Sequence, residues 1–153
     1  MAPLTHSYFC GASTTQIIYK TIGRYFDEMV QDHPDNPALL VRHQGISWTY
    51  RELQTRVDQL ATGLLALNVM PGDRVGIWGP NSSEWVLVQL ATAKIGAVMV
   101  CINPAYRLYE LEYALNKVSC SVLICDVQFK TSDYLGMITT LAPELALSRQ
   151  DHL

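Results

Sequence analysis

The amino-acid sequence predicts an α/β fold, a parallel sheet with helices on both faces. Segments with strand-like and helix-like hydrophobic patterns alternate along the chain, and this order is typical of successive βαβ units. The mainly apolar runs at 74–78, 97–102 and 121–125 show no polar–apolar alternation. Strands of this kind are covered on both faces in parallel sheets, and we expect right-handed crossovers between them.

The chain is predicted to begin with an irregular lead-in followed by a helix. Residues 1–18 are mostly polar and small, and we interpret them as the lead-in. Thr21 opens the helix, and His33-Pro34 ends it because the residue before a proline is displaced from the α region. Helical spacing joins Ile22, Tyr25, Phe26, Met29 and Val30.

A hairpin and a second helix are predicted next. The pattern over 38–48 indicates two short strands joined by a turn at 43–45. Thr49 and Glu52 fit a capping box, in which the two residues satisfy each other's backbone amides at a helix start. Asn68 marks the end of this helix. Its apolar stripe consists of Leu53, Val57, Leu60, Ala61 and Leu64.

A helix over 82–94 is predicted between the strands at 74–78 and 97–102. Asn81 and Glu84 resemble a second cap, and Gly96 is well placed to end the helix. Because this helix is apolar nearly all round, we expect it to be buried.

The last elements are two helices on either side of the strand at 121–125. Asn103-Pro104 ends the preceding strand. Helical spacing joins Leu108, Leu111, Leu115 and Val118 before the strand, and Tyr134, Leu135, Ile138 and Leu141 after it. From 143 to 153 the periodicity is lost, and we interpret these residues as an unpatterned tail.

The composition excludes several classes of protein. The 153 residues are 49% hydrophobic and 16% charged, with a net charge of −3. Intrinsic disorder requires lower hydrophobicity, and nucleic-acid binding requires a basic patch. No apolar stretch approaches the ~20 residues of a membrane-spanning helix. Typical domains carry about 25% charged residues. The lower charged fraction here indicates apolar surface that this chain does not itself bury.

The spacing of reactive side chains assigns no catalytic, cofactor-binding or metal-ligating residue. The four cysteines form no Cys-x-x-Cys pair and indicate a reducing compartment. The carboxylate pairs Asp27/Glu28 and Glu110/Glu112 are interpreted as solvated helix faces, because close neighbours on a helix do not converge on one substrate. The tryptophans Trp48, Trp78 and Trp85 are interpreted as core aromatics with a nearby partner for the N–H.

One turn resembles an anion-binding site. The segment from Gly76 to Ser83 joins a strand to a helix, and a helix N-terminus can hold a phosphate. Glu84 lies in the first turn of that helix and would repel an anion. We therefore favour a turn that only caps the helix over a phosphate site.

Three segments resemble the acyl-adenylate-forming superfamily, which includes acyl-CoA synthetases. Residues 47–53 (SWTYREL) are similar to its first conserved core, and residues 93–97 (AKIGA) with 103–106 (NPAY) are similar to its second. The Asn-Pro-Ala-Tyr form is typical of fatty acyl-CoA ligases. The resemblance extends from about residue 7 to residue 143.

The resemblance implies a two-step ligase reaction. Such enzymes join a fatty acid to ATP with Mg²⁺, release pyrophosphate, and transfer the acyl group from acyl-AMP to CoA. In the family, the phosphate loop and the catalytic lysine follow the matched region. We therefore expect 19–142 to be a partial N-terminal AMP-binding domain, a truncated piece of the acyl-CoA synthetase fold that is inactive alone.

The resemblance leaves one candidate CoA contact. A loop aligning with Asn103-Pro104-Ala105 and a basic residue aligning with Lys130 lie near the CoA nucleotide in acetyl-CoA synthetases. We favour the simpler interpretation, a turn after a strand and a solvated lysine, since nucleotide positions vary within the superfamily.

Two further alternatives concern partners and location. The chain could act as a non-catalytic interaction module that associates with a full-length homologue through a sheet edge or helix face. A self-contained nucleotide binder is disfavoured by the missing phosphate loop. The resemblance implies a mitochondrial protein, whereas the lack of an arginine-rich presequence favours the cytoplasm as the alternative.

Overall fold

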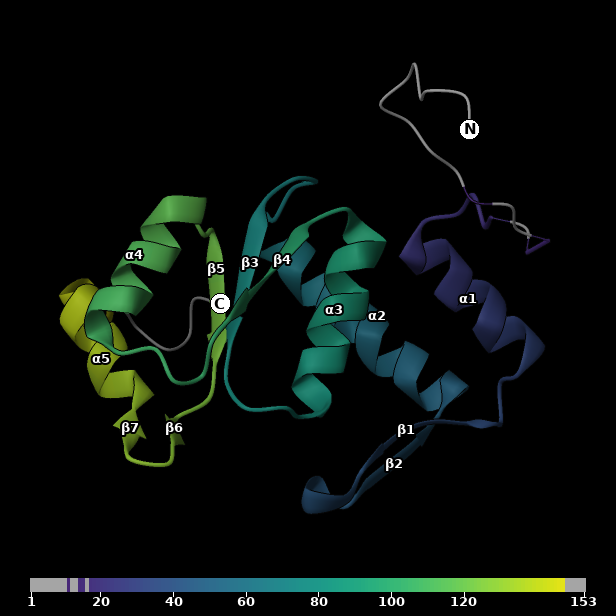
Figure 1. Ribbon diagram of the computed structural model, residues 1–153, viewed down its shortest axis with the longest axis horizontal. Coiled ribbons are helices and arrows are strands. Elements are labelled where there is room, and N and C mark those ends of the chain that lie inside the picture. Colours follow the sequence, from purple (N-terminus) through teal and green to yellow (C-terminus); the bar gives the residue numbers. More distant parts are fainter. Residues whose placement is uncertain (1–10, 12–13, 16, 148–153) are drawn as a thin grey trace, which may run out of the picture.

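A three-stranded parallel sheet lies at the centre of the computed structural model, which describes residues 11, 14–15 and 17–147 (Figure 1). The strands are β3 (Arg74–Trp78), β4 (Val98–Ile102) and β5 (Val122–Cys125), in the order β4-β3-β5. The predicted parallel sheet is confirmed, and its central strand β3 is almost completely buried.

Helices cover both faces of this sheet (Figure 1). On one face lie α2 (Tyr50–Ala66) and α3 (Ser83–Ile95), with α1 (Ile22–Asp32) packed against them; α4 (Leu108–Val118) and α5 (Tyr134–Leu141) lie on the other. Successive side chains of β3 point to opposite faces of the sheet, as in any strand. Val75 and Ile77 join the core beneath α2 and α3, whereas Trp78 joins the core beneath α4 and α5.

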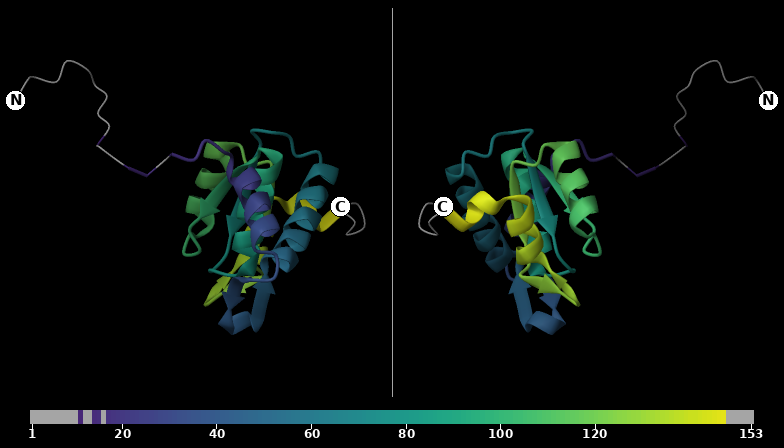
Figure 2. Two further views of the ribbon diagram at one scale, coloured as in Figure 1. Left: turned by 90° about the vertical axis from the view of Figure 1, so that its right-hand side faces the viewer. Right: turned by 90° about the vertical axis from the view of Figure 1, so that its left-hand side faces the viewer.

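Two antiparallel hairpins project at the end of the molecule where the central strands finish (Figures 1 and 2). The first consists of β1 (Pro37–Val41) and β2 (Ile46–Thr49), joined by a 3₁₀ turn at Arg42–Gln44, and confirms the predicted hairpin. The second, β6 (Gln128–Phe129) with β7 (Ser132–Asp133), was not predicted.

The two ends of the chain fall largely outside the described residues. Most of the expected lead-in over 1–18 and the residues from 148 onward are among those not described. Within the expected tail, a 3₁₀ helix forms over Pro143–Leu147.

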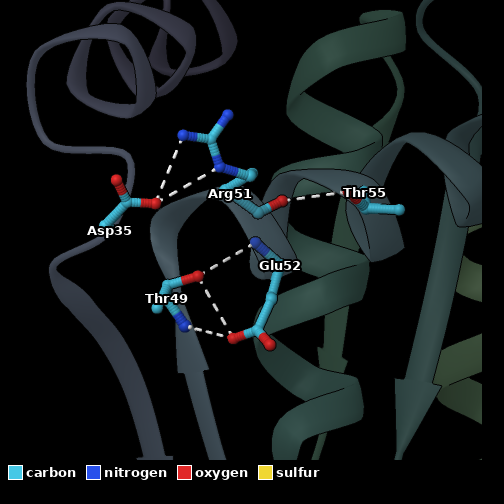
Figure 3. Close-up of polar contacts among 5 residues, drawn as sticks. All are labelled: Asp35, Thr49, Arg51, Glu52 and Thr55. Atoms are coloured by element: carbon cyan, nitrogen blue, oxygen red, sulfur yellow. Dashed lines mark hydrogen bonds and ion pairs between the residues drawn. The ribbon is translucent and has the colours of Figure 1, made fainter.

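Caps begin the first two helices, and the second of them is the predicted capping box. The Thr21 hydroxyl accepts the Arg24 amide at the start of α1. At the start of α2, the Thr49 hydroxyl accepts the Glu52 amide at 3.3 Å, and the Glu52 carboxylate accepts the Thr49 amide at 2.8 Å (Figure 3). This reciprocal pair is the capping box, and it satisfies two amides that the helix leaves unpaired.

The predicted cap of the third helix is wrong. Ser82, not Asn81, is the N-cap residue of α3, and its side chain accepts no capping hydrogen bond. The amide of Ser83 instead donates to Oε1 of Gln44, on the turn of the β1–β2 hairpin, at 2.7 Å. A residue 39 positions away thus supplies the cap, and no local pattern could have indicated it.

Helix α3 is buried by neighbours on several sides, as its apolar composition predicts. It contacts α1, α2, β3 and β4. Gly23 of α1 lies so close that a Cβ there would approach Cα of Lys94 to 3.0 Å. Gly96 ends the helix in the left-handed region, at a φ of 77°.

Strand β4 departs from the expectation that both faces of each strand are covered. Its first residue Val98 is 49% exposed, and Cys101 is also exposed. Among the described residues β4 pairs with β3 alone, so it forms an edge of the sheet. An apolar run identifies a sheet strand but does not distinguish a central strand from an edge strand.

Asp27 also departs from its prediction as part of a solvated helix face. Its carboxylate accepts Nζ of Lys94 at 2.7 Å and the Gln54 amide at 2.9 Å. The same ammonium group contacts Asp58 of α2 at 2.5 Å, and the Lys94 side chain is only 18% exposed. This cluster therefore joins α1, α2 and α3.

Candidate ligand site at the carboxyl ends of the strands

The carboxyl ends of the three parallel strands lie at one edge of the sheet. The loops that leave them cover 79–82, 103–107 and 126–127. Open α/β sheets bind their ligands in the crevice outside these strand ends. The structure therefore places its candidate site among these loops.

A cavity of about 260 Å³ opens at this edge between β3, β5 and the turn of the first hairpin. Its polar lining includes His43, Gln44, Glu84 and Asp126, and Trp85 supplies an aromatic surface. The Trp85 indole N–H donates to the carbonyl of Gly79 at 3.2 Å, which fixes the loop after β3. Trp85 therefore has the N–H partner that the sequence predicts.

The start of α3 at this cavity is occupied by the protein's own groups. Gln44 accepts the Ser83 amide through Oε1 and donates Nε2 to the Glu84 carboxylate at 2.9 Å. The Ser83 hydroxyl donates to the same carboxylate at 3.1 Å. Burial raises the pKa of Glu84, but hydrogen bonds from Gln44, the Glu84 backbone, Ser82 and Ser83 outweigh it and leave the pKa lowered.

Glu84 therefore carries its negative charge at neutral pH, against the positive end of the helix dipole. A phosphate at the same place would meet a carboxylate and an amide that is already bonded. These contacts support the interpretation of the segment from Gly76 to Ser83 as a helix-capping turn. A bonded amide and a carboxylate at this helix start do not suit a nucleotide phosphate.

Cys125, the last residue of β5, and Asp126, the first of the following loop, line the edge of the cavity. Burial raises the pKa of the Cys125 thiol, and the negative charge of Asp126 raises it further. A protonated thiol is a poor nucleophile.

The loop after β4 is held by two buried aromatic side chains. The Trp78 indole N–H donates to the Asn103 carbonyl at 3.1 Å, and the Tyr134 hydroxyl donates to the next carbonyl, that of Pro104, at 2.6 Å. The two rings stack with centroids 3.6 Å apart. Burial raises the pKa of Tyr134, and Asp126 and Cys125 raise it further, so the hydroxyl keeps its proton.

The candidate CoA residues lie on neighbouring segments. Lys130 occupies the turn between β6 and β7 with a φ of 52°, and its ammonium lies 5.3 Å from the centre of the Phe129 ring. Arg107 donates to the Ser132 hydroxyl at 3.1 Å, which joins the 103–107 loop to this hairpin. The structure thus brings the loop beside the hairpin that carries Lys130.

Some contributions to this edge were not visible in the sequence. Tyr134 was predicted only as part of an apolar helix stripe, because its hydroxyl contact depends on a residue 30 positions away. Glu110 was predicted to be solvated. Its carboxylate instead accepts a hydrogen bond from the Arg107 backbone amide at 3.1 Å and caps the start of α4. The spacing of Arg107 and Glu110 carries this signal only in part, since the first position of a capping box is usually Ser or Thr.

Two features of composition have structural counterparts. In the part of the chain that the structure describes, no helix is long and apolar enough to cross a membrane. Cys101, Cys120 and Cys125 are free thiols, and Cys10 lies outside the described residues.

Known proteins resemble this chain in sequence and in fold. The family model described as AMP-binding enzyme matches residues 26–151. The medium-chain acyl-CoA ligase ACSF2, mitochondrial, of Bos taurus is 46% identical over 139 residues, which make up 91% of this chain and 23% of that protein. The chain therefore spans about a quarter of the length of the curated relatives it matches.

Solved structures agree with this assignment. A structure described as a long-chain-fatty-acid CoA ligase from Rhodopseudomonas palustris superposes with a TM-score of 0.72 and 29% identity, covering 82% of this chain and 30% of that one. The N-terminal domain of FACL13 from Mycobacterium tuberculosis gives a TM-score of 0.67 at 29% identity, over 69% and 27% of the two chains. On the strength of the family match and the shared fold, this chain belongs to the AMP-binding enzyme family.

Proposed function

We propose that this chain provides the N-terminal part of an ATP-dependent fatty acid–CoA ligase that acts on medium-chain acids through an acyl-adenylate. The observation that carries the proposal is the 46% identity to a medium-chain acyl-CoA ligase over 139 residues. Fatty acid, ATP and CoA are the proposed substrates and Mg²⁺ the proposed cofactor. Residues 19–142 are the proposed partial AMP-binding domain.

Within this proposal the chain contributes structure and not chemistry. The buried sheet and its aromatic contacts hold the three loops at the carboxyl edge, as the bonds from Trp78 and Tyr134 to the 103–107 loop illustrate. None of the described residues is assigned to adenylation or thioester formation. The 153 residues alone are therefore expected to form no pyrophosphate from ATP and octanoate.

A chimera tests the proposal. The 139 matched residues replace their counterparts in the bovine ligase, and acyl-CoA formation is measured with octanoate, ATP, Mg²⁺ and CoA. We expect kcat/KM within about tenfold of the parent, a difference of about 1.4 kcal/mol in the barrier. A ligase lacking these residues is the negative control. A folded chimera with no activity would overturn the proposal, and turnover by the isolated chain would overturn its structural role.

A second candidate function is a non-catalytic module that associates with a full-length acyl-CoA synthetase. The exposed apolar residues of β4 and α4 favour it, because exposed apolar patches mark interfaces. Co-purification of the isolated chain with the bovine ligase would support this function. If the isolated chain and the bovine ligase elute separately when mixed at the concentration of the ligase assay, the result would count against this function.

A finer proposal concerns CoA. The position of the 103–107 loop beside the hairpin of Lys130 supports a contact between these residues and the CoA nucleotide. In the chimera, Lys130→Glu is then expected to raise the KM for CoA and leave the KM for ATP unchanged. An unchanged KM for CoA supports the simpler interpretation of a solvated lysine.

The cellular compartment that we propose is the one named for the relatives. The bovine relative is named as mitochondrial, and we propose the same compartment, with the cytoplasm as the alternative. Fractionation of cells that express the protein with a C-terminal tag distinguishes the two. Recovery of the tag with the mitochondrial matrix supports the proposal, and recovery in the cytosol alone contradicts it.

A further inference from the structure

Strand β4 presents an unusual edge. Its sequence Val-Met-Val-Cys-Ile contains neither a charge nor a proline, the residues that natural proteins use to prevent edge-to-edge pairing. Among the described residues its only strand partner is β3. The opposite side of β4 therefore offers a row of backbone donors and acceptors next to apolar side chains.

An apolar groove runs beside this edge. It has a volume of about 260 Å³ and lies between β4 and helix α4. From α4 come Tyr109, which is 78% exposed, and Tyr113, which is 60% exposed. The residues that line this groove are mainly apolar, and together with the free edge of β4 we call them the β4–α4 surface.

The charges on this surface are arranged to suit a copy of itself. Glu110 in the first turn of α4 and Lys117 in the last turn both line the groove. They are seven residues apart, or about 10 Å along the helix. A twofold axis level with the middle of α4 reverses the direction of the second helix and sets each Glu110 opposite the Lys117 of the other copy.

We propose that the β4–α4 surface is a self-association site that binds a second copy of this chain. The two β4 strands pair antiparallel about a twofold axis near Val100, which joins two three-stranded sheets into one of six. Both α4 helices then lie on the same face of that sheet, antiparallel to each other. An isologous interface of this kind requires a self-complementary surface, and the Glu110–Lys117 arrangement provides one.

The first test is the mass of the purified chain in solution. Sedimentation velocity over a range of concentrations is expected to show a reversible monomer–dimer equilibrium, with a dimer of twice the 17.1 kDa chain mass. A monomer at every concentration overturns the proposal. So does open-ended assembly, or association with the bovine ligase without any self-association.

Charge variants locate the interface. Val98→Lys places a charge on the β4 edge and is expected to abolish the dimer. Lys117→Glu sets like charges face to face twice per dimer and is expected to raise the dissociation constant at least tenfold. Leu40→Lys on β1 and Arg42→Glu on the hairpin turn are matched controls at exposed positions, and both should leave the dimer intact. Circular dichroism confirms that each variant is folded.

A zero-length carbodiimide cross-link tests the orientation directly. Equal amounts of ¹⁴N- and ¹⁵N-labelled chain are mixed and cross-linked, and the joined peptides are identified by mass spectrometry. A mixed-label peptide that joins Glu110 to Lys117 is expected. A dimer that lacks this cross-link and resists both Val98→Lys and Lys117→Glu uses another surface and overturns the proposal.

Discussion

The two faces of the central sheet are built very differently. Beneath α2 and α3 lies a large core of eleven buried apolar residues, whereas the core beneath α4 and α5 contains four. The first core is mainly aliphatic. The second depends on one stacked aromatic pair, Trp78 with Tyr134, and on their bonds to a loop. The contrast indicates that the first face has the larger buried core, and that the second relies on a few specific contacts.

The largest effect is expected from matched leucine truncations on the two faces. Leu64 of α2 and Leu111 of α4 are both buried. Leu64→Ala is expected to lower the free energy of unfolding by about 4 kcal/mol and Leu111→Ala by about 2 kcal/mol, because fewer buried neighbours surround the second cavity. Urea unfolding of both variants measures the difference. Equal losses would show that the two cores are equally tight.

The next effect concerns the Tyr134 hydroxyl. Tyr134→Phe keeps the stacked ring and removes only the hydrogen bond to the Pro104 carbonyl. We expect a loss of about 1–2 kcal/mol, since a part-buried carbonyl is left without its donor. Tyr113→Phe, at an exposed position on α4, serves as the control and should cost almost nothing. A Tyr134→Phe protein as stable as the original would show that packing alone holds this face.

A smaller effect is expected from the charges that join α1 to α2 and α3. Burial raises the pKa of Asp27, but hydrogen bonds from Lys94 and Gln54 and the Lys94 charge outweigh it, so the pKa lies below 3.8. Burial lowers the pKa of Lys94, but its bonds to Asp27 and Asp58 outweigh it, so that pKa lies above 10.5. Both groups are therefore charged, and their contribution is fully present, between these two values.

The variant Lys94→Met is expected to cost about 1 kcal/mol across that range. Because the folded pKa of Asp27 is depressed, its stabilisation is lost as the pH falls through that lowered value. The difference between the two proteins should therefore shrink below pH 3.8. Unfolding curves at pH 7 and pH 3 measure it. A difference that is the same at both values would mean that Lys94 acts only through its aliphatic packing.

The smallest effects concern the helix caps. Thr49→Ala removes a hydroxyl that accepts the Glu52 amide and is expected to cost about 1 kcal/mol. Ser82→Ala is the matched variant at α3, where the side chain makes no capping bond, and about 0.5 kcal/mol or less is expected. Thermal unfolding ranks the two. A larger loss for Ser82→Ala would contradict the role of Gln44 as the cap of α3.

The sequence allowed the elements to be predicted because their causes are local. The capping box at Thr49, the left-handed Gly96 and the apolar spacing of each helix act within a few residues. Strand β3 has the predicted bounds, Arg74–Trp78. The resemblance on residues 47–53, 93–97 and 103–106 indicated the family that the comparisons confirm.

What could not be predicted depends on contacts between distant residues. Gln44 reaches the amide of Ser83, and Tyr134 reaches the carbonyl of Pro104, only after the chain has folded. Likewise, β4 and the almost completely buried β3 have similar apolar runs, and only the strand order makes β4 an edge. The candidate site is made mainly of such contacts between distant residues. The predicted parallel sheet indicates where its strand ends lie, but the geometry of the site could not be predicted.

Native-state hydrogen exchange tests the difference between the two faces most directly. Amides of α2 and α3 are expected to exchange only through global unfolding, so their opening free energies should fall together as urea is added. Amides of α4 and α5 are expected to exchange through a smaller opening that depends little on urea. Equal opening free energies for all four helices would contradict the account, because the two faces would then unfold as one unit.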